Sequence, residues 1–132
     1  MSQLKKGIAS FDLDGVIFLG YGFPGIYPGR DDIIITGRCF EEMLETKGFL
    51  ESRFIYNQVF YQPIPFVEKT RVKSGFFKAN KINELIAEGY QIVVHLDDDP
   101  IQADIIENNT KIPVIRIFHN LTEKENVRHF VE

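Results

Sequence analysis

The 132-residue chain has little of what several protein classes require. Its single cysteine, Cys39, excludes an internal disulfide framework. It has no apolar run near the roughly 20 residues of a membrane span, and its first residues lack the apolar core of a secretion signal. The 15 basic and 19 acidic residues give a net charge of -4, which provides no general attraction to nucleic acids or anionic membranes. We therefore expect one domain, residues 1–132, in a reducing, cytoplasmic compartment.

Short apolar runs alternate with helical patterns along the chain. The runs are typical of strands buried on both faces. Between them, residues 40, 43, 44 and 47 share one face of an expected helix, as do residues 82, 85, 86 and 89, with Gly48 and Gly89 at the expected helix ends. This alternation predicts an α/β fold with a central, mainly parallel five-stranded sheet. The expected strands are 7–11, 32–36, 53–56, 91–96 and 113–118.

Two stretches interrupt this alternation. Residues 16–31 are rich in glycine, proline and aromatic residues, which favours a hairpin-like flap. Residues 57–76 contain two prolines, followed by Lys69, Arg71 and Lys73 at alternate positions. If this part is extended, the three cations share one face and could follow a polyanionic backbone, although a solvated stripe is the more common meaning.

Polar side chains follow the ends of three expected strands. The carboxyl ends of parallel strands meet at one edge of a sheet, which is where ligands bind in such folds. Several carboxylates at one edge repel each other and need a cation, and oxygen ligands without a Cys or His cluster favour Mg²⁺ over zinc. The residues concerned are Asp12 and Asp14 after the first strand, Thr36, Gly37 and Arg38 at the second, and Asp97, Asp98 and Asp99 at the fourth.

At these positions the sequence resembles the haloacid dehalogenase (HAD) superfamily of phosphohydrolases. The first motif, a strand followed by D-x-D-G, is matched by FDLDGVI at 11–17, and the second, a strand ending in Thr or Ser, by IIIT at 33–36. The third, a lysine near a helix start, is matched by FFK at 76–78, and the fourth, an acidic pair, by HLDD at 95–98. The resemblance implies a three-layer Rossmann-like fold, and the intervals between motifs leave no room for a substantial cap domain.

The resemblance also implies a division of catalytic labour. Asp12 would be the nucleophile that forms an aspartyl-phosphate, and Asp14 the general acid and base. Thr36 and Lys78 would stabilise the charge of the phosphoryl group. Lys73 competes with Lys78 for the lysine role, but Lys78 lies four residues before Ile82 on the inward helix face.

The same resemblance supplies the metal and substrate ligands. Mg²⁺ would be held by Asp12, by the backbone carbonyl of Asp14, and by Asp97 with or without Asp98. The run TGR at 36–38 is similar to capless domains related to polynucleotide 3′-phosphatases, which adds Gly37 and Arg38 to Thr36 and Lys78 as substrate-binding residues. A phosphorylated nucleotide or nucleic-acid end is therefore one expected substrate.

Several other polar residues have simpler explanations. Asp99 precedes Pro100 at an expected helix start, so it is predicted to cap that helix. Cys39 has no arginine at the spacing of a phosphate loop and is expected to be packed. The three histidines are expected to be structural, with His119 and His129 away from the acidic edge. Thr122 and Glu125 have the spacing of a capping box and predict a C-terminal helix.

The order of the motifs distinguishes the phosphatase from some other classes of protein, but not from all of them. A receiver domain carries its acidic pair first, whereas here the order is Asp, Thr, Lys and then the acidic pair, which excludes it. A HAD-like binding or regulatory module without turnover remains an alternative, although it has little use for Asp14. Within the enzyme class, a small-metabolite phosphatase remains an alternative to one acting on macromolecular ends.

Overall fold

The computed structural model describes residues 7–20 and 23–119. Within them a five-stranded, all-parallel sheet has the strand order β3-β2-β1-β4-β5. The chain starts in the middle of the sheet, builds outward to β3, and then returns to the other side of β1. The strands are β1 Ile8–Phe11, β2 Ile33–Cys39, β3 Val59–Gln62, β4 Ile92–Asp97 and β5 Val114–Arg116.

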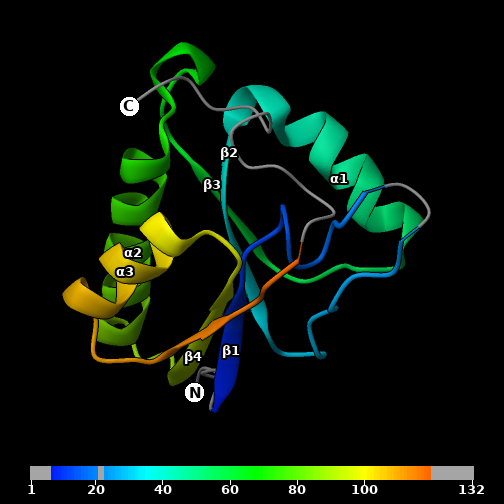
Figure 1. Ribbon diagram of the computed structural model, residues 1–132. Coiled ribbons are helices and arrows are strands. Elements are labelled where there is room, and N and C mark those ends of the chain that lie inside the picture. Colours follow the sequence, from blue (N-terminus) through cyan, green and yellow to red (C-terminus); the bar gives the residue numbers. More distant parts are fainter. Residues whose placement is uncertain (1–6, 21–22, 120–132) are drawn as a thin grey trace.

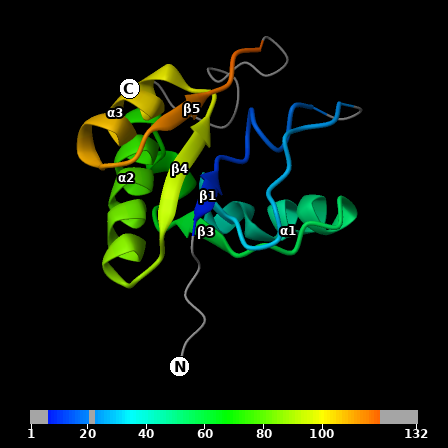
Figure 2. The same cartoon turned by 90° about the horizontal axis from the view of Figure 1, so that it is seen from below.

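Helices cover both faces of the sheet, which gives the three layers of a Rossmann-like fold (Figures 1 and 2). Helices α2 (Arg71–Ala87) and α3 (Pro100–Asn109) pack against each other on one face, and α1 (Met43–Ser52) lies on the other. Two short 3-10 helices, η1 (Phe40–Glu42) and η2 (Phe66–Glu68), precede α1 and α2. The predicted fold class is therefore confirmed.

The apolar run of β2 shows why the sheet lies between two layers. Ile33, Ile34 and Ile35 are all fully buried. Since successive side chains of a strand point to opposite faces, Ile33 and Ile35 join the core beneath α2 and α3, while Ile34 joins the core beneath α1. A strand that is apolar at every position requires cover on both sides.

The expected strand at 53–56 is wrong. Helix α1 continues to Ser52, Phe54 adopts a positive φ of 59°, and the Ile55 amide returns to the Leu50 carbonyl. Phe54 and Tyr56 are exposed, so the apolar letters of this run do not form a buried strand. The third strand is β3, which lies within residues 57–76, one of the two stretches that interrupt the alternation in the sequence.

The expected inward face of α1 is also wrong. Leu44 is 87% exposed, and the helix contacts the sheet through Thr46 and Leu50 instead. The Thr46 hydroxyl donates to the Glu42 carbonyl and accepts from Arg38, so polar contacts set the orientation of this helix. Gly48 lies inside the helix and does not end it, whereas Gly89, with a φ of 108°, follows the end of α2 as predicted.

The segment after β1 is not a hairpin in the part that the structure describes. Residues 12–20 and 23–32 contain turns and one isolated bridge between Asp14 and Phe18, without a pair of strands. The Ile26 amide donates to the Val16 carbonyl and holds the returning chain against the first turn. The site is therefore bordered by a loop and not by a folded cap.

The prediction that Lys69, Arg71 and Lys73 share one face of an extended segment is wrong as well. Thr70 caps α2 by accepting from the Lys73 amide, so Arg71 and Lys73 belong to a helix and not to an extended strand. Lys69 is buried against Glu42, and Arg71 pairs with Asp99. Lys73 is exposed. Among the described helices, none has the length and apolar character to cross a bilayer.

Candidate functional site

Buried charges gather beyond the carboxyl ends of β1, β2 and β4. The chain adds β2 and β3 on one side of β1 and then β4 and β5 on the other. Open parallel sheets bind ligands at the point where the strand order reverses in this way. A small pocket at this point is lined by Asp12, Asp14, Arg38, Lys69, Lys78 and Gln102. Gly37 also lines it. The structure therefore brings five of the eight predicted site residues to one pocket and adds two that were not predicted.

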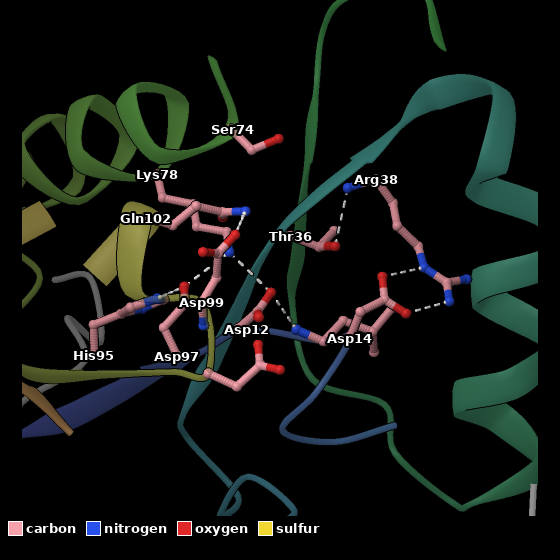
Figure 3. Close-up of polar contacts among 12 residues, drawn as sticks. Asp12, Asp14, Thr36, Arg38, Ser74, Lys78, His95, Asp97, Asp99 and Gln102 are labelled. Carbon is pink, nitrogen blue, oxygen red and sulfur yellow. Dashed lines mark hydrogen bonds and ion pairs between the residues drawn. The ribbon is translucent and has the colours of Figure 1, made fainter. Parts of the chain in front are cut away.

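Lys78 joins two of the predicted aspartates. Its Nζ lies 2.9 Å from Asp12 Oδ1 and 2.9 Å from Asp97 Oδ2, and all three side chains are almost completely buried (Figure 3). The lysine extends from α2 toward the sheet edge, while the carboxylates come from the ends of β1 and β4. The helical spacing that favoured Lys78 over Lys73 therefore agrees with the position of Lys78 in the structure.

His95 holds Asp97 from the opposite direction. Its Nε2 lies 2.9 Å from Asp97 Oδ2, and its Nδ1 lies 2.7 Å from the Ser10 hydroxyl, with all three side chains fully buried. A carboxylate can only accept, so Nε2 carries the hydrogen of the first contact. His95, which was expected to be structural, is therefore in contact with a predicted site residue. Its position two residues before Asp97 on one strand was the available signal.

Asp12, Asp97 and Asp98 form a group that could hold a metal ion. Each offers one carboxylate oxygen, and these oxygens lie within 4.8 Å of one another. An oxygen-only set of carboxylates is suited to Mg²⁺ or Ca²⁺ more than to zinc. In this corner three carboxylates accompany one lysine, and buried carboxylates in excess are normally balanced by a cation.

The structure explains why the first motif has a glycine at position 15. Its φ is +90°, and a Cβ atom there would lie 1.8 Å from Asp98 Oδ2. A side chain at this position would therefore displace Asp98 from the acidic group. His119 Nε2 lies 2.9 Å from the same Asp98 oxygen, so the expectation that His119 is away from the acidic edge is wrong. His129 and the predicted helix at Thr122 lie outside the described residues.

Arg38 holds both oxygens of Asp14. Its Nε and one terminal nitrogen donate to the carboxylate at 2.9 and 2.7 Å (Figure 3). The other terminal nitrogen donates to Thr46. Burial opposes the charge of Arg38, but the hydrogen bond and the charge of Asp14 raise the pKa of the guanidinium above its ordinary value. Such a bidentate contact favours the ionised form of a carboxyl group.

The residues of the TGR run occupy different positions. Thr36 is buried, and its hydroxyl oxygen accepts from the Arg38 amide at 3.1 Å, so it stabilises the irregular end of β2 that carries Arg38. It is not part of the pocket lining. Gly37 lies so close to α2 that a Cβ atom would stand 2.7 Å from the Ser74 hydroxyl. Only a residue without a side chain lets the strand end pass α2 at this distance.

Glu42 connects Cys39 and Lys69 beside the pocket. One carboxylate oxygen accepts from Lys69 Nζ at 3.0 Å and from the Cys39 amide at 3.0 Å, and the thiol lies 3.5 Å from the same atom. Cys39 is buried, as predicted, and burial raises the pKa of its thiol to about 11. Cys39 and Glu42 have the spacing of a capping box at the start of η1, which was the available signal for this pair, whereas no sequence pattern links either residue to Lys69.

Asp99 has the capping role that its sequence predicts. Its side chain accepts from the Ile101 amide, with Pro100 in the first turn of α3. It also accepts two bonds from Arg71 and one from Gln102. This cap fixes α3 against the start of α2 and thereby places Gln102 at the pocket.

A scan against protein-family models and a search of curated proteins each returned no match to the chain.

Proposed function

We propose that the chain is a Mg²⁺-dependent phosphomonoester hydrolase of the HAD type that works through an aspartyl-phosphate. The observation that carries this proposal is the position of Asp12. Its carboxylate reaches the pocket beside Lys78 and stands within the acidic group that includes Asp97 and Asp98. A nucleophilic carboxylate beside a fixed ammonium and a cation site is suited to phosphoryl transfer.

The proposed reaction has two steps. An Asp12 oxygen attacks phosphorus, the bond from phosphorus to the ester oxygen breaks, and the leaving oxygen takes a proton from Asp14. Water then attacks the same phosphorus and gives a proton to Asp14, and the bond from phosphorus to Asp12 breaks. The sum is ester plus water giving alcohol plus inorganic phosphate, with both aspartates restored.

The remaining site residues support this chemistry in the proposal. Lys78 keeps Asp12 in place and balances charge on the phosphoryl group, while Gly37 and Arg38 border the space it occupies. Thr36 acts mainly by stabilising the end of β2 that carries Arg38. Mg²⁺ would be held by Asp12, Asp97 and Asp98, with the Asp14 carbonyl, and when bound it would withdraw charge from the phosphoryl oxygens.

One observation favours the alternative of a HAD-like binding or regulatory module without turnover. Asp14 must exchange a proton in each step of the proposed reaction, yet Arg38 contacts both of its oxygens. For turnover, this contact must loosen when substrate binds. If it does not, the same pocket can bind a phosphorylated ligand without hydrolysing it.

The choice of substrate rests on what borders the pocket. In the described part, the residues between β1 and β2 form a loop and not a folded cap, which favours a large phosphorylated group such as a nucleotide or nucleic-acid end. Asp12 is 2% exposed, so the bordering loop must move aside when such a substrate binds. Lys69 and Arg71 pair with Glu42 and Asp99, so the predicted basic stripe is not available to bind a long polynucleotide. A screen of nucleotides, 3′- and 5′-phosphorylated oligonucleotides, sugar phosphates and phosphopeptides separates these classes from a small-metabolite phosphatase.

The proposal is tested by turnover of an aryl phosphate with Mg²⁺. Asp12→Asn should lower the rate by at least about a thousandfold, because it removes the nucleophile. Asp104→Asn, the same chemical change at an exposed position on α3, is the matched control and should leave the rate within about twofold. A rate for Asp12→Asn within tenfold of wild type would reject the mechanism, and tight ligand binding without turnover would favour the binding module.

A further inference from the structure

Lys69 is a buried cation at the pocket that belongs to none of the four motifs. It lies at the end of η2, its side chain is 1% exposed, and it lines the same pocket as Asp12, Arg38 and Lys78. Lysine is rarely buried to this degree unless it has a specific partner. Lys73, four residues along the chain, shows the ordinary exposed position.

The Lys69 ammonium has more N–H donors than its hydrogen bond to Glu42 uses. It has three N–H donors. One donates to Glu42 at 3.0 Å, and the ring of Phe66 lies 5.7 Å from Nζ. Burial lowers the pKa of Lys69 against the opposing effect of Glu42, so a further anion beside it would stabilise the charged form.

Gln102 supplies an independent observation on the same pocket. Its Nε2 donates to Asp99 Oδ2 at 2.9 Å, which fixes the orientation of the amide, and Figure 3 shows the side chain extending alongside Lys78. Its Oε1 is buried and accepts no hydrogen bond from the described residues. A buried acceptor of this kind has a free-energy cost unless a ligand or water donates to it.

Together these two side chains offer donors and one acceptor to the same small space. We propose that Lys69 and Gln102 form a subsite for inorganic phosphate, in which Lys69 donates to phosphate oxygens and Gln102 Oε1 accepts from the phosphate hydroxyl. The hydrogen phosphate dianion has both kinds of group. Sulfate has the same shape and charge but no hydroxyl, so Gln102 has nothing to accept from it. The inference rests on the proposed function only for the choice of phosphate, the reaction product, as the anion.

The subsite predicts a selectivity that no purely structural role for these residues explains. A site that hydrogen-bonds a ligand hydroxyl discriminates against the analogue that lacks it. Lys69 should therefore strengthen binding of both anions, while Gln102 should strengthen binding of phosphate alone. Bound phosphate should also inhibit turnover more than sulfate does.

The test measures binding of phosphate and of sulfate by calorimetry in the presence of Mg²⁺. Since Lys69→Met leaves Glu42 buried without its lysine, the comparison is made between Glu42→Gln and the double variant Glu42→Gln/Lys69→Met. The double variant should bind both anions about tenfold more weakly or worse. Lys73→Met, with the same change of charge at an exposed position, should bind both within about twofold.

Gln102→Met completes the pattern. It should weaken phosphate binding about fivefold to tenfold and leave sulfate binding within about twofold. Equal loss of both anions in Gln102→Met, unchanged binding in the Lys69 comparison, or no phosphate binding by the wild-type protein at millimolar concentration would each overturn the subsite. Because no turnover is needed, a selective phosphate site on a protein that hydrolyses nothing would keep this inference and reject the proposed function.

Discussion

The two sides of the site balance their buried charges in different ways. On the β2 side, defined here as Asp14, Arg38, Glu42 and Lys69, each carboxylate contacts its own cation. On the β4 side, defined as Asp12, Asp97, Asp98 and Lys78, three carboxylates accompany one lysine, which contacts Asp12 and Asp97, while Asp98 contacts His119. Both sides lie at the same sheet edge, so their difference comes from side-chain placement and not from position in the fold.

This difference indicates different tasks for the two sides. A closed ion pair needs no metal ion to balance its charge and can be replaced by apolar side chains at small cost. A corner with excess negative charge is unfavourable on its own and becomes stable when a cation binds. We therefore infer that the β4 side is the one that could hold a metal ion, while the ion pairs of the β2 side hold the end of β2 and the neighbouring helix in place. Four predictions test this contrast, from the largest expected effect to the smallest.

Removing Lys78 should give the largest loss of stability. Lys78→Met leaves the carboxylates of Asp12 and Asp97 buried without the lysine, so we expect the free energy of unfolding to fall by about 3–5 kcal/mol. Urea denaturation measures the loss. Lys73→Met, at an exposed position of the same helix, should change the same quantity by no more than about 0.5 kcal/mol. Equal effects of the two variants would show that the buried charges do not depend on Lys78.

Mg²⁺ should stabilise the β4 side. At a concentration a hundredfold above its dissociation constant, we expect about 2.7 kcal/mol of added stability, seen as a higher melting temperature. Asp98→Asn should reduce this shift and at the same time raise the stability of the metal-free protein, because it removes one of the three neighbouring carboxylates. A melting temperature that does not respond to Mg²⁺ at low salt would contradict the metal site.

Alkaline pH should weaken the β2 side through Cys39. The pKa of the thiol rises from 9.0 to about 11 on folding, so between these pH values the unfolded chain loses a proton that the folded protein keeps. The stabilising effect is complete below pH 9 and is lost as the pH rises toward 11, by at most about 2.7 kcal/mol.

A comparison of wild type with Cys39→Ala separates the contribution of this thiol to the pH dependence of stability from that of other titrating groups. Lys69 shifts in the opposite direction, since burial lowers its pKa. Urea denaturation of both proteins under reducing conditions should therefore show a steeper decline for wild type than for Cys39→Ala. Parallel declines would show that the thiol titrates equally in the folded and unfolded states.

Replacing both members of the closed pair should have the smallest effect. Asp14→Leu/Arg38→Met removes two opposite buried charges together, so we expect a free energy of unfolding within about 1 kcal/mol of wild type. Arg38→Met alone should cost several times more, because it leaves Asp14 buried without the guanidinium. If the double variant is as unstable as the single one, Arg38 acts mainly through Thr46 and Phe18, which it also contacts.

Residues close together in sequence were the most predictable part of the site. The alternation of short apolar runs and helical patterns predicted the parallel sheet, and the residues after β1 and β4 predicted which aspartates share its edge. Lys78 could be chosen over Lys73 because helical spacing sets which residue faces inward. Asp99 and Pro100 specified a helix start, since a cap depends only on adjacent backbone amides.

Errors arose where burial, and not the local pattern, decides the structure. In the run at 53–56 Ile55 is buried but Phe54 and Tyr56 are exposed, and α1 contacts the sheet through Thr46 while Leu44 faces outward. The alternating cations at 69–73 were given one face, but the cap at Thr70 starts a helix and sends Lys69 inward. The Thr70 cap and the hydrogen bond from Ile55 to Leu50 are local, whereas the buried position of Lys69 depends on Glu42, 27 residues away in the sequence.

The sequence by itself determined the class of fold and the set of carboxylates at the sheet edge, because parallel strands all end at the same edge of the sheet. Only the tertiary structure decided the partners of the more distant residues: Arg38 with Asp14, Lys69 with Glu42 and Gln102 with the pocket. These pairings join segments up to tens of residues apart, and they depend on side-chain directions that are fixed when the helices pack on the sheet. A local pattern carries no information about such distances, whereas buried charges require them to be satisfied.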